Sequence, residues 1–274
     1  MPPRLTRGGV LKIATWNVNG IRARQSQVLD WLAQEKPDVV CFQEIKASPD
    51  QLTFELRDIE NYWGHWHGGR GYSGVALLFS KQFAPSGPSI VHPVFDFEQR
   101  ICTATVPTSA GDITFASIYV PNGGKDFPSK MRFLEGIESW AADAQLAGHP
   151  LVLCGDLNVA RSDIDIHPKE RKPNQVGARP DERAIFEQIL RHDLVDVGRA
   201  LEPENENLFT WWAPWRNMRQ RNIGWRIDYV LATSWIAERT RAMTVQREVG
   251  TSDHGPVIAT FELATGESDE LAIG

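Results

Sequence analysis

Runs of apolar residues alternate with segments of helical periodicity from the first part of the chain onward. The run 10–16 predicts a buried strand, and residues 23–34 predict a helix because their apolar side chains fall on one face. The run 38–43 predicts a second buried strand. This strand–helix–strand order predicts a βαβ-like start to an α/β fold.

The same periodicities continue along the chain. Runs rich in β-branched and apolar residues, bounded by Gly or Pro, predict further strands at 74–80, 99–106, 112–120, 150–156, 226–233, 241–246 and 256–262. Helical spacing predicts helices at 128–145 and 181–191, whereas the polar, Pro-bearing stretch 163–180 predicts a long loop. The strands occur in two runs accompanied by helices. We therefore expect one α/β domain over 1–274, with two packed sheets, helices outside, a core at about 10–263 and short tails, the C-terminal one acidic.

Composition places the chain among globular proteins. Its 274 residues and 42% hydrophobic content suffice for the core of one large domain. No apolar run reaches the ~20 residues that span a bilayer, and the first ten residues lead into no apolar signal segment. The odd set Cys41, Cys102 and Cys154 argues against a disulfide framework and for a reducing compartment. We expect a cytoplasmic monomer without membrane contact.

The net charge of −6 counts against a polyanionic partner only until its distribution is considered. Residues 1–29, 61–95 and 207–227 carry Arg and Lys but no Asp or Glu. Such segregation favours one face that binds polyanions. Chance clustering on a solvated surface explains the charges equally well, so charge alone leaves both interpretations open.

Polar side chains stand where apolar strands are predicted to stop. These residues are Asn17, Glu44, Tyr119, Asp156, Asn158, Asp228, Asp253 and His254. Strand ends can aim side chains into one cleft, although any single residue of the set is better explained as an ordinary turn former or cap. Glu44 and Asp228 are less easily explained so, because a carboxylate beside a buried strand is costly to desolvate unless it is paired or metal-bound.

The donor types in this set indicate a chemistry. Carboxylate and amide oxygens suit a hard cation such as Mg²⁺ or Mn²⁺, and no Cys/His spacing typical of zinc is found. The adjacent Asp253 and His254, with another buried Asp, can form an acid–base relay. These parts together suit the hydrolysis of a phosphate ester.

Seven segments resemble, in order, the exonuclease III family of apurinic/apyrimidinic endonucleases, within the wider endonuclease/exonuclease/phosphatase superfamily. They are KIATWNVNGIRAR (12–24), PDVVCFQEIK (37–46), GYSGVALL (71–78), IYVPNG (118–123), GDLNVA (155–160), NIGWRIDYVLA (222–232) and TSDHGPV (251–257). The resemblance implies a four-layered α/β sandwich, two packed mixed β-sheets flanked by helices, with the site at one rim. It also implies a metal-dependent DNA repair nuclease that cuts 5′ to abasic sites, with 3′→5′ exonuclease and 3′-end-trimming activity on duplex DNA, associated with the nucleoid if the source is prokaryotic.

The resemblance also implies a metal set. Glu44 resembles the main metal-ligand carboxylate, Asn17 supports it, and Asp253 lies beside that metal directly or through water. Candidates for a second metal position are Asp156, Asn158 and His254. One or two Mg²⁺ ions are expected, with Mn²⁺ able to substitute, and the sequence leaves their number open.

Catalytic roles follow from the same resemblance. Asp156 resembles the residue that activates the attacking water, and Asn158 the residue that positions it. His254 is expected to contact the scissile phosphate, oriented by Asp228, with the phenol of Tyr119 nearby. Whether Asp156 or Tyr119 is the main proton acceptor stays open at this point.

The substrate class is implied by aromatic and basic positions. Trp211, Trp225 and Ile227 match a slot that holds an extrahelical abasic sugar and excludes a sugar with its base. Ordinary core packing is the alternative for a Trp cluster, weakened here because these tryptophans are interleaved with arginines. The interleaved set is Trp211, Trp212, Trp215 and Trp225 with Arg216, Arg219, Arg221 and Arg226.

Further positions match contacts to the DNA backbone or its grooves. These are Arg22, Lys46, Tyr72 and Lys125, with Asn174 as a further candidate in a loop that aligns poorly. Trp215 stands where relatives carry other residues that probe the groove, and it is expected to contact DNA together with Arg216 and Arg219. Segments 160–180 and 212–221 follow the family only in outline. The balance between abasic-site incision and exonuclease activity therefore stays open.

Two rival functions remain. Another phosphoesterase of the superfamily, such as an inositol-phosphate phosphatase, a sphingomyelinase or an RNA deadenylase, would share the metal and catalytic residues but not the GWRIDY segment with its paired tryptophans. A non-catalytic DNA-binding module would have lost its chemistry, whereas every catalytic position is intact here.

Overall fold

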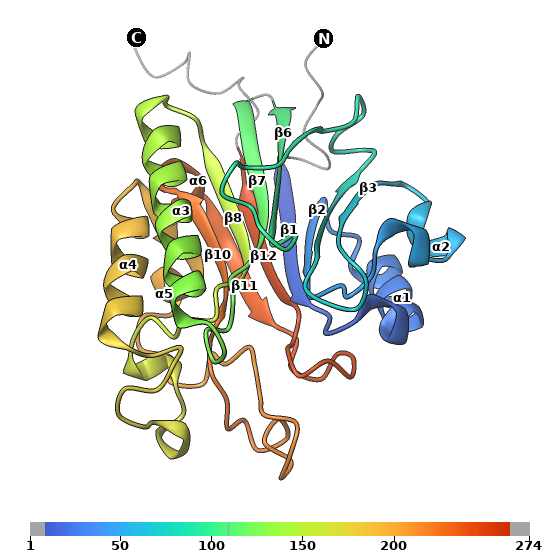
Figure 1. Cartoon of the computed structure of the whole chain (residues 1–274). Coiled ribbons are helices and arrows are strands. Elements are labelled where there is room, and N and C mark those ends of the chain that lie inside the picture. The colour runs from blue at the N-terminus through green and yellow to red at the C-terminus, as the bar shows by residue number, and fades with distance from the viewer. Residues whose placement is uncertain (1–8, 109, 264–274) are drawn as a thin grey trace.

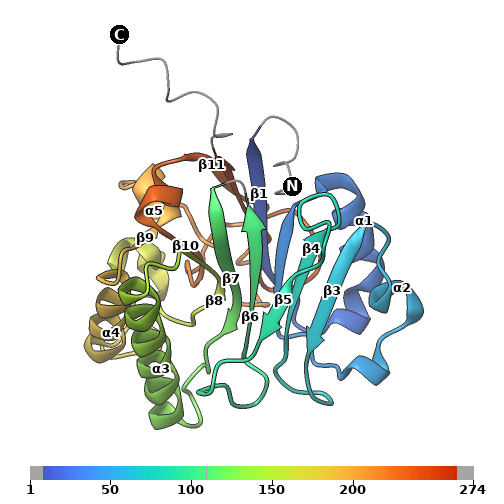
Figure 2. The same cartoon turned by 90° about the horizontal axis from the view of Figure 1, so that it is seen from above.

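The computed structural model describes residues 9–108 and 110–263, so the predicted tails lie outside the described residues. Two six-stranded sheets face each other, with helices on both outer sides (Figures 1 and 2). The first sheet has the order β11 (Thr240–Val245), β12 (Val257–Glu262), β1 (Val10–Asn17), β2 (Val39–Gln43), β4 (Val75–Ser80), β3 (Tyr62–His67). The second has the order β5 (Ser89–Val91), β6 (Ile101–Thr108), β7 (Gly111–Tyr119), β8 (Leu151–Asp156), β10 (Asp228–Thr233), β9 (Leu194–Asp196). Each sheet is mixed, which confirms the predicted four-layered sandwich: β1–β2 and β7–β8 are parallel and the other pairs antiparallel.

The helices form the outer layers. They are α1 (Gln25–Glu35), α2 (Phe54–Arg57), α3 (Phe127–Leu146), α4 (Pro180–Leu190), α5 (Val197–Leu201) and α6 (Ser234–Ala237). In Figure 2, α3 and α4 cover the second sheet on one side, and α1 and α2 flank the first sheet on the other. Among the described residues, no helix is both long enough and apolar enough to cross a bilayer.

The central strands are buried on both faces, which explains their continuous apolar runs. On β1, Ile13 packs into the core between the sheets while Trp16 packs against α1. On β8, Cys154 faces the inter-sheet core and Leu153 faces the α3 side. Alternation of side chains along a strand thus builds three hydrophobic layers from two sheets.

The central strands and long helices predicted from the sequence are confirmed within a few residues, whereas three edge strands were missed. These strands are β3, β5 and β9, and two of them have only three residues. β3 reads YWGHWH, with a glycine and two histidines in place of apolar residues. The predicted loop 163–180 contains two single 3₁₀ turns, Asp163–Asp165 and Pro168–Glu170.

The carboxyl ends of both parallel pairs meet at one rim of the sandwich. β1 and β2 end there at Asn17 and Gln43, and β7 and β8 end there at Tyr119 and Asp156. The long yellow and orange loops gather below this rim in Figure 1. Polar residues at these strand ends are therefore brought together by topology.

Candidate active site

Strand pairing places three of the predicted residues side by side. Tyr119 is the register partner of Asp156 in the β7–β8 ladder, and Asp228 is its partner in the β8–β10 ladder. The strands approach closely because Gly155 precedes Asp156: a Cβ at Gly155 would lie 1.9 Å from the carbonyl oxygen of Ile118. The glycine is therefore required for the position of the Asp156 carboxylate.

Two site residues occupy an unusual backbone region. Glu44, directly after β2, has a φ of 53°, and Asn158, two residues after β8, has a φ of 52°. Non-glycine residues with positive φ are uncommon and cluster where surrounding structure over-determines them, often at functional sites. Asn158 is held by its Nδ2, which donates to the Val120 carbonyl at 2.9 Å, and by its carbonyl, which accepts from Lys130 Nζ at 2.6 Å.

A hydrogen-bonded acid–base chain lies at the centre of the rim. Nδ1 of His254 lies 2.9 Å from Oδ2 of Asp228, which also accepts a hydrogen bond from the Thr210 hydroxyl at 2.6 Å. On the other side of the ring, Nε2 of His254 lies 3.8 Å from Oδ2 of Asp156. The Asp156 carboxylate in turn accepts hydrogen bonds from Asn17 Nδ2 and from the backbone N–H of Asn158. The geometry thus gives the order Asp228–His254–Asp156, whereas the relay expected from the sequence paired His254 with its neighbour Asp253 and another buried Asp.

Burial and neighbouring charges shift the pKa values of these active-site residues. Burial raises the pKa of Asp156 to about 7, against the opposing effect of His254. Burial disfavours the charged form of His254, but the Asp228 carboxylate, with Asp156 and Asp253, raises its pKa to about 10. Burial, followed by the charges of Glu44 and Asp156, raises the pKa of Tyr119 above that of a free phenol. At neutral pH the cleft thus holds an imidazolium, a carboxyl group near its titration point and a neutral phenol.

The chemistry of the donor set fits a divalent cation. The carboxylates of Glu44, Asp156 and Asp253 line the cleft, and the carboxylate of Asp228 lies behind His254. Ligand atoms of Asp156, Asp228 and His254 all lie within 4.8 Å of one another. Oδ1 of Asp228 is buried without a hydrogen-bond partner. A hard cation would neutralise the excess negative charge and bind the oxygen atoms that lack hydrogen-bond partners.

The remaining metal-site predictions lie in the same cleft. Asn17 and Glu44 line it together with Asp253. Asp253 is fixed from two sides, because Oδ1 accepts from Asn19 Nδ2 and Oδ2 accepts from Trp211 Nε1, each at 2.9 Å. Despite burial, His254 and these donors lower the pKa of Asp253, which keeps it ionised.

Two indoles wall one side of the cleft, which has a volume of about 460 Å³. The rings of Trp211 and Trp225 meet edge to face at 6.3 Å between centroids, with Ile227 packed beside them. Gly177 lies against the Trp225 ring and also lines the cleft. The three residues predicted as a sugar slot are thus contiguous and open to the catalytic groups.

The predicted DNA-contact residues lie outside this cleft. Most are exposed: Arg22, Tyr72, Lys125, Asn174, Trp215 and Arg216. Lys46 is half-buried and pairs with Glu44 at 3.0 Å. Tyr72 is tied to the rim by buried Arg100, which donates to its hydroxyl at 2.8 Å and lies over the Tyr119 ring.

Arg219 is placed differently from the other basic residues. Its guanidinium donates to the carbonyls of Arg247, Val249 and Ser252 and lies over the Trp212 ring. The geometry gives Arg219 a positioning role for the 247–252 segment, next to Asp253.

The interpretation of the Trp/Arg interleaving as one DNA-binding surface is wrong for two members. Arg226 is 1% exposed and pairs with Asp165 and Asp196, and Trp212 is equally buried in a small core of its own. Both stabilise the loops beneath the surface. The sequence pattern does not distinguish an arginine that faces a carboxylate from one that faces solvent.

Several residues of the site were not singled out from the sequence. Thr210 supports Asp228, Asn19 links Asp253 to Lys46, and Asn122 donates to Asn158 Oδ1 at 3.3 Å. Asn19 and Asn122 stand in the matched segments KIATWNVNG and IYVPNG, and Thr210 stands directly before the tandem tryptophans. Proximity to those motifs is the signal that identifies them.

Comparison with known proteins assigns the family. The model of the endonuclease/exonuclease/phosphatase family matches residues 14–254. The chain is 34% identical to DNA repair nuclease APEX1 of Danio rerio, over 93% of this chain and 85% of that protein. It is 32% identical to an exodeoxyribonuclease of Bacillus subtilis, over 90% of this chain and 98% of that one.

Solved structures agree with this assignment. An AP endonuclease from Archaeoglobus fulgidus superposes with a TM-score of 0.81 at 31% identity, covering 92% of this chain and 99% of that one. The 3′ phosphatase NExo from Neisseria, bound to a product DNA hairpin, superposes with a TM-score of 0.81 at 29% identity, with the same coverage. The chain therefore belongs to the endonuclease/exonuclease/phosphatase family, in its branch of exodeoxyribonuclease III-type AP endonucleases.

Proposed function

We propose that this protein hydrolyses the phosphodiester bond 5′ to abasic sites in duplex DNA and trims 3′ ends, with Mg²⁺ as cofactor and Mn²⁺ as a substitute. The proposal rests on one observation. The Asp228–His254–Asp156 chain lies directly beside the slot that Trp211 and Trp225 form. The relatives named above act on DNA as AP endonucleases, exodeoxyribonucleases or a 3′ phosphatase, according to their names. Their names support the same substrate for this chain.

The cation would be held by oxygen donors on the first-sheet side of the cleft. Glu44 and Asn17 lie there with Asp253, and Asp156 and Asn158 lie across the cleft. When bound, a divalent cation offsets charge on the phosphate and lowers the barrier to attack by water. Hard oxygen ligands favour Mg²⁺ or Mn²⁺ over softer metals.

Asp156 is placed to accept the proton of the attacking water. Its carboxylate is oriented by Asn17 and by the N–H of Asn158, and burial raises its pKa to about 7, close to the working pH of a general base. Tyr119 stays a neutral phenol in this environment, because burial and the nearby carboxylates raise its pKa. We assign Tyr119 the role of hydrogen-bond donor toward the phosphate.

His254 is placed to stabilise charge on the scissile phosphate. Its Nδ1–H donates to Asp228 Oδ2, which leaves the Nε2–H directed into the cleft. The Asp228 carboxylate raises the pKa of His254 to about 10, so the imidazolium persists at neutral pH. A fixed cation beside a developing negative charge stabilises the transition state without reorganisation.

The indole slot supports the choice of an abasic sugar. A sugar without its base has few polar groups, so shape and apolar contact must hold it. Trp211, Trp225 and Ile227 supply such a wall directly beside Asp253 and His254. The exposed basic residues Arg22, Lys125 and Arg216 lie outside the slot, where we place the DNA backbone.

All residues of the proposed site come from one chain, which supports action as a monomer and as a single domain over 1–274. Three buried, unpaired cysteines support a reducing compartment such as the cytoplasm.

A cleavage assay tests the proposed function. We expect Mg²⁺-dependent incision of a duplex with one abasic analogue, loss of incision with a chelator, and trimming of a recessed 3′ end. The Asp156→Asn variant should bind the duplex but cleave it at least ~10²-fold more slowly. Hydrolysis of poly(A) or a phosphoinositide in preference to the abasic duplex would instead assign the chain to another branch of the superfamily.

A further inference from the structure

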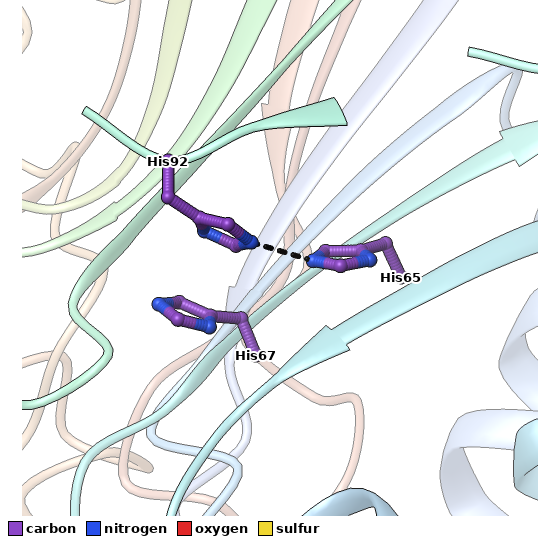
Figure 3. Close-up of side chains that lie close together, drawn as sticks. All are labelled: His65, His67 and His92. Atoms are coloured by element: carbon purple, nitrogen blue, oxygen red, sulfur yellow. Dashed lines mark hydrogen bonds between the residues drawn. The ribbon is translucent and has the colours of Figure 1, made fainter. Parts of the chain in front are cut away.

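Three histidines meet at the edge of the sandwich, away from the cleft described above. His65 and His67 lie on β3, and His92 follows β5 directly (Figure 3). β3 is the edge strand of the first sheet and β5 is the edge strand of the second. The three side chains therefore come from both sheets and meet where the inter-sheet layer opens to solvent.

Strand pairing accounts for their direction. In the β3–β4 ladder, His65 is the partner of Leu77 and His67 is the partner of Val75, and both partners belong to the core between the sheets. Directly paired residues project on the same face of a sheet. Both imidazoles thus point toward the second sheet, and Figure 3 shows His92 pointing back at them.

The nitrogen spacing fits a metal ion. Nε2 of His65 lies 3.2 Å from Nε2 of His92, and the His67 ring centroid lies 3.9 Å from that of His92. Two nitrogens on one tetrahedral Zn²⁺ at 2.0–2.1 Å are about 3.3 Å apart. One ligand atom from each histidine can be chosen so that all three lie within 4.8 Å of one another. A small rotation of one ring therefore completes three ligands around a single ion.

One histidine also carries the second contact that metal-bound histidines usually have. Nε2 of His67 lies 2.7 Å from Oδ2 of Asp96, which leaves Nδ1 for a metal. Asp96 is itself fixed, because its Oδ1 accepts hydrogen bonds from the backbone N–H groups of Arg100 and Ile101. A carboxylate behind an imidazole sets the tautomer and raises the basicity of the ligand.

Two of the three rings, those of His65 and His92, favour the neutral form that ligation needs. Burial, with the charges of the neighbouring imidazoles, lowers the pKa of His65 to about 4. Burial also lowers the pKa of His92. Neutral imidazoles present lone pairs, so metal binding at His65 and His92 competes less with a proton.

We propose that His65, His67 and His92 form a site for one transition-metal ion of the Zn²⁺ type, which clamps the open edges of the two sheets together. Three nitrogen donors suit Zn²⁺, Ni²⁺ or Cu²⁺, whereas the oxygen-rich cleft suits Mg²⁺. The half-exposed position leaves the fourth coordination place to water. The sequence shows no metal-binding motif here, because the third histidine follows His67 by 25 residues and lies on the other sheet.

Zn²⁺ titration in a large excess of Mg²⁺ tests this proposal, because Mg²⁺ competes for the oxygen-rich cleft but not for imidazoles. We expect the wild type to bind one Zn²⁺ and to melt at a higher temperature with Zn²⁺ present. His92→Gln and His65→Gln should lose both effects while retaining Mg²⁺-dependent DNA cleavage. Exposed His149 lies elsewhere, so His149→Gln is the matched control and should behave as wild type.

Asp96→Asn should weaken Zn²⁺ binding by about 10–100-fold, as expected for a carboxylate that orients a ligating histidine. Two results would overturn the proposal. One is Zn²⁺ binding of equal affinity in wild type and His92→Gln. The other is loss of Zn²⁺ binding on addition of Mg²⁺, which would assign the ion to the cleft.

Discussion

At the scale of single residues, the Asp228–His254 hydrogen bond decides in which pH range the cleft holds an imidazolium. Asp228 is 2% exposed and touches His254 at 2.9 Å, so its charge acts on the ring with little screening by solvent. Asp228 therefore tunes a catalytic group without facing the substrate.

This gives a pH prediction. The pKa of His254 stands at about 10 against an ordinary value of 6.5, and the charged form is present below the pKa. In Asp228→Asn the pKa should fall toward 6.5, so the cleavage rate should decline from neutral pH upward instead of at alkaline pH. Single-turnover rates measured across the pH range test this. An alkaline limb identical in the two proteins would show that Asp228 does not act through the charge on His254.

The indole slot gives a second prediction at this scale. Trp225→Ala should reduce abasic-site incision by about 2–4 kcal/mol of transition-state binding while trimming of an intact 3′ end is less affected. Trp63→Ala is the control, because that indole is 41% exposed, lies outside the cleft and belongs to no predicted DNA contact. Rates on both substrates should be measured with the melting temperature. Equal loss of both activities with a lower melting temperature would make Trp225 a core residue only.

At the scale of elements, the close approach of β7 and β8 sets the position of Asp156. Gly155→Ala should destabilise the fold by at least about 3 kcal/mol, because its Cβ would lie 1.9 Å from the Ile118 carbonyl. Gly148→Ala is a matched control: it also has positive φ, but its Cβ would meet nothing within 4 Å, so only about 1 kcal/mol is expected. Denaturant unfolding measures both. Equal losses would mean that strand spacing is not what Gly155 provides.

The individual strands also show which parts of the fold can be predicted from the sequence. β1 and β8 were predicted because both of their faces are buried, which requires uninterrupted apolar residues. β3 was missed because an edge strand, which is less buried than a central strand, tolerates Gly64 and His65. The histidine cluster was not predicted for the same reason, because two of its three residues lie on β3.

The site was predicted to the extent that its residues directly follow strands. Asn17, Glu44 and Asp156 are aimed by the strands that precede them, so the sequence pattern and the resemblance place them correctly in one cleft. Thr210 and Asn19 act through side chains that reach partners far along the chain, and no local pattern encodes such contacts. Arg226 shows the converse, since a basic residue amid aromatics is buried by two acids from distant segments.

At the scale of the whole molecule, the cleft exists only where the two sheets face each other. Asn17 and Glu44 come from the first sheet, and Asp156 comes from the second. The hydrogen bonds from Asn17 to Asp156 and from His254 to Asp228 join the two sides directly. Loss of sheet–sheet packing should therefore abolish activity at the same denaturant concentration at which tertiary structure is lost.

The order of the first sheet has a consequence for how the enzyme is made. β1 is synthesised before β12, yet it lies between β2 and β12, and β12 is the last strand described in the chain. Asp253 and His254 stand a few residues before β12, and the Ser252 hydroxyl donates to the Asn17 carbonyl. A nascent chain that stops short of these residues thus carries neither the imidazole nor the paired central strand. An active cleft therefore requires synthesis of the chain through β12 and pairing of β12 with β1.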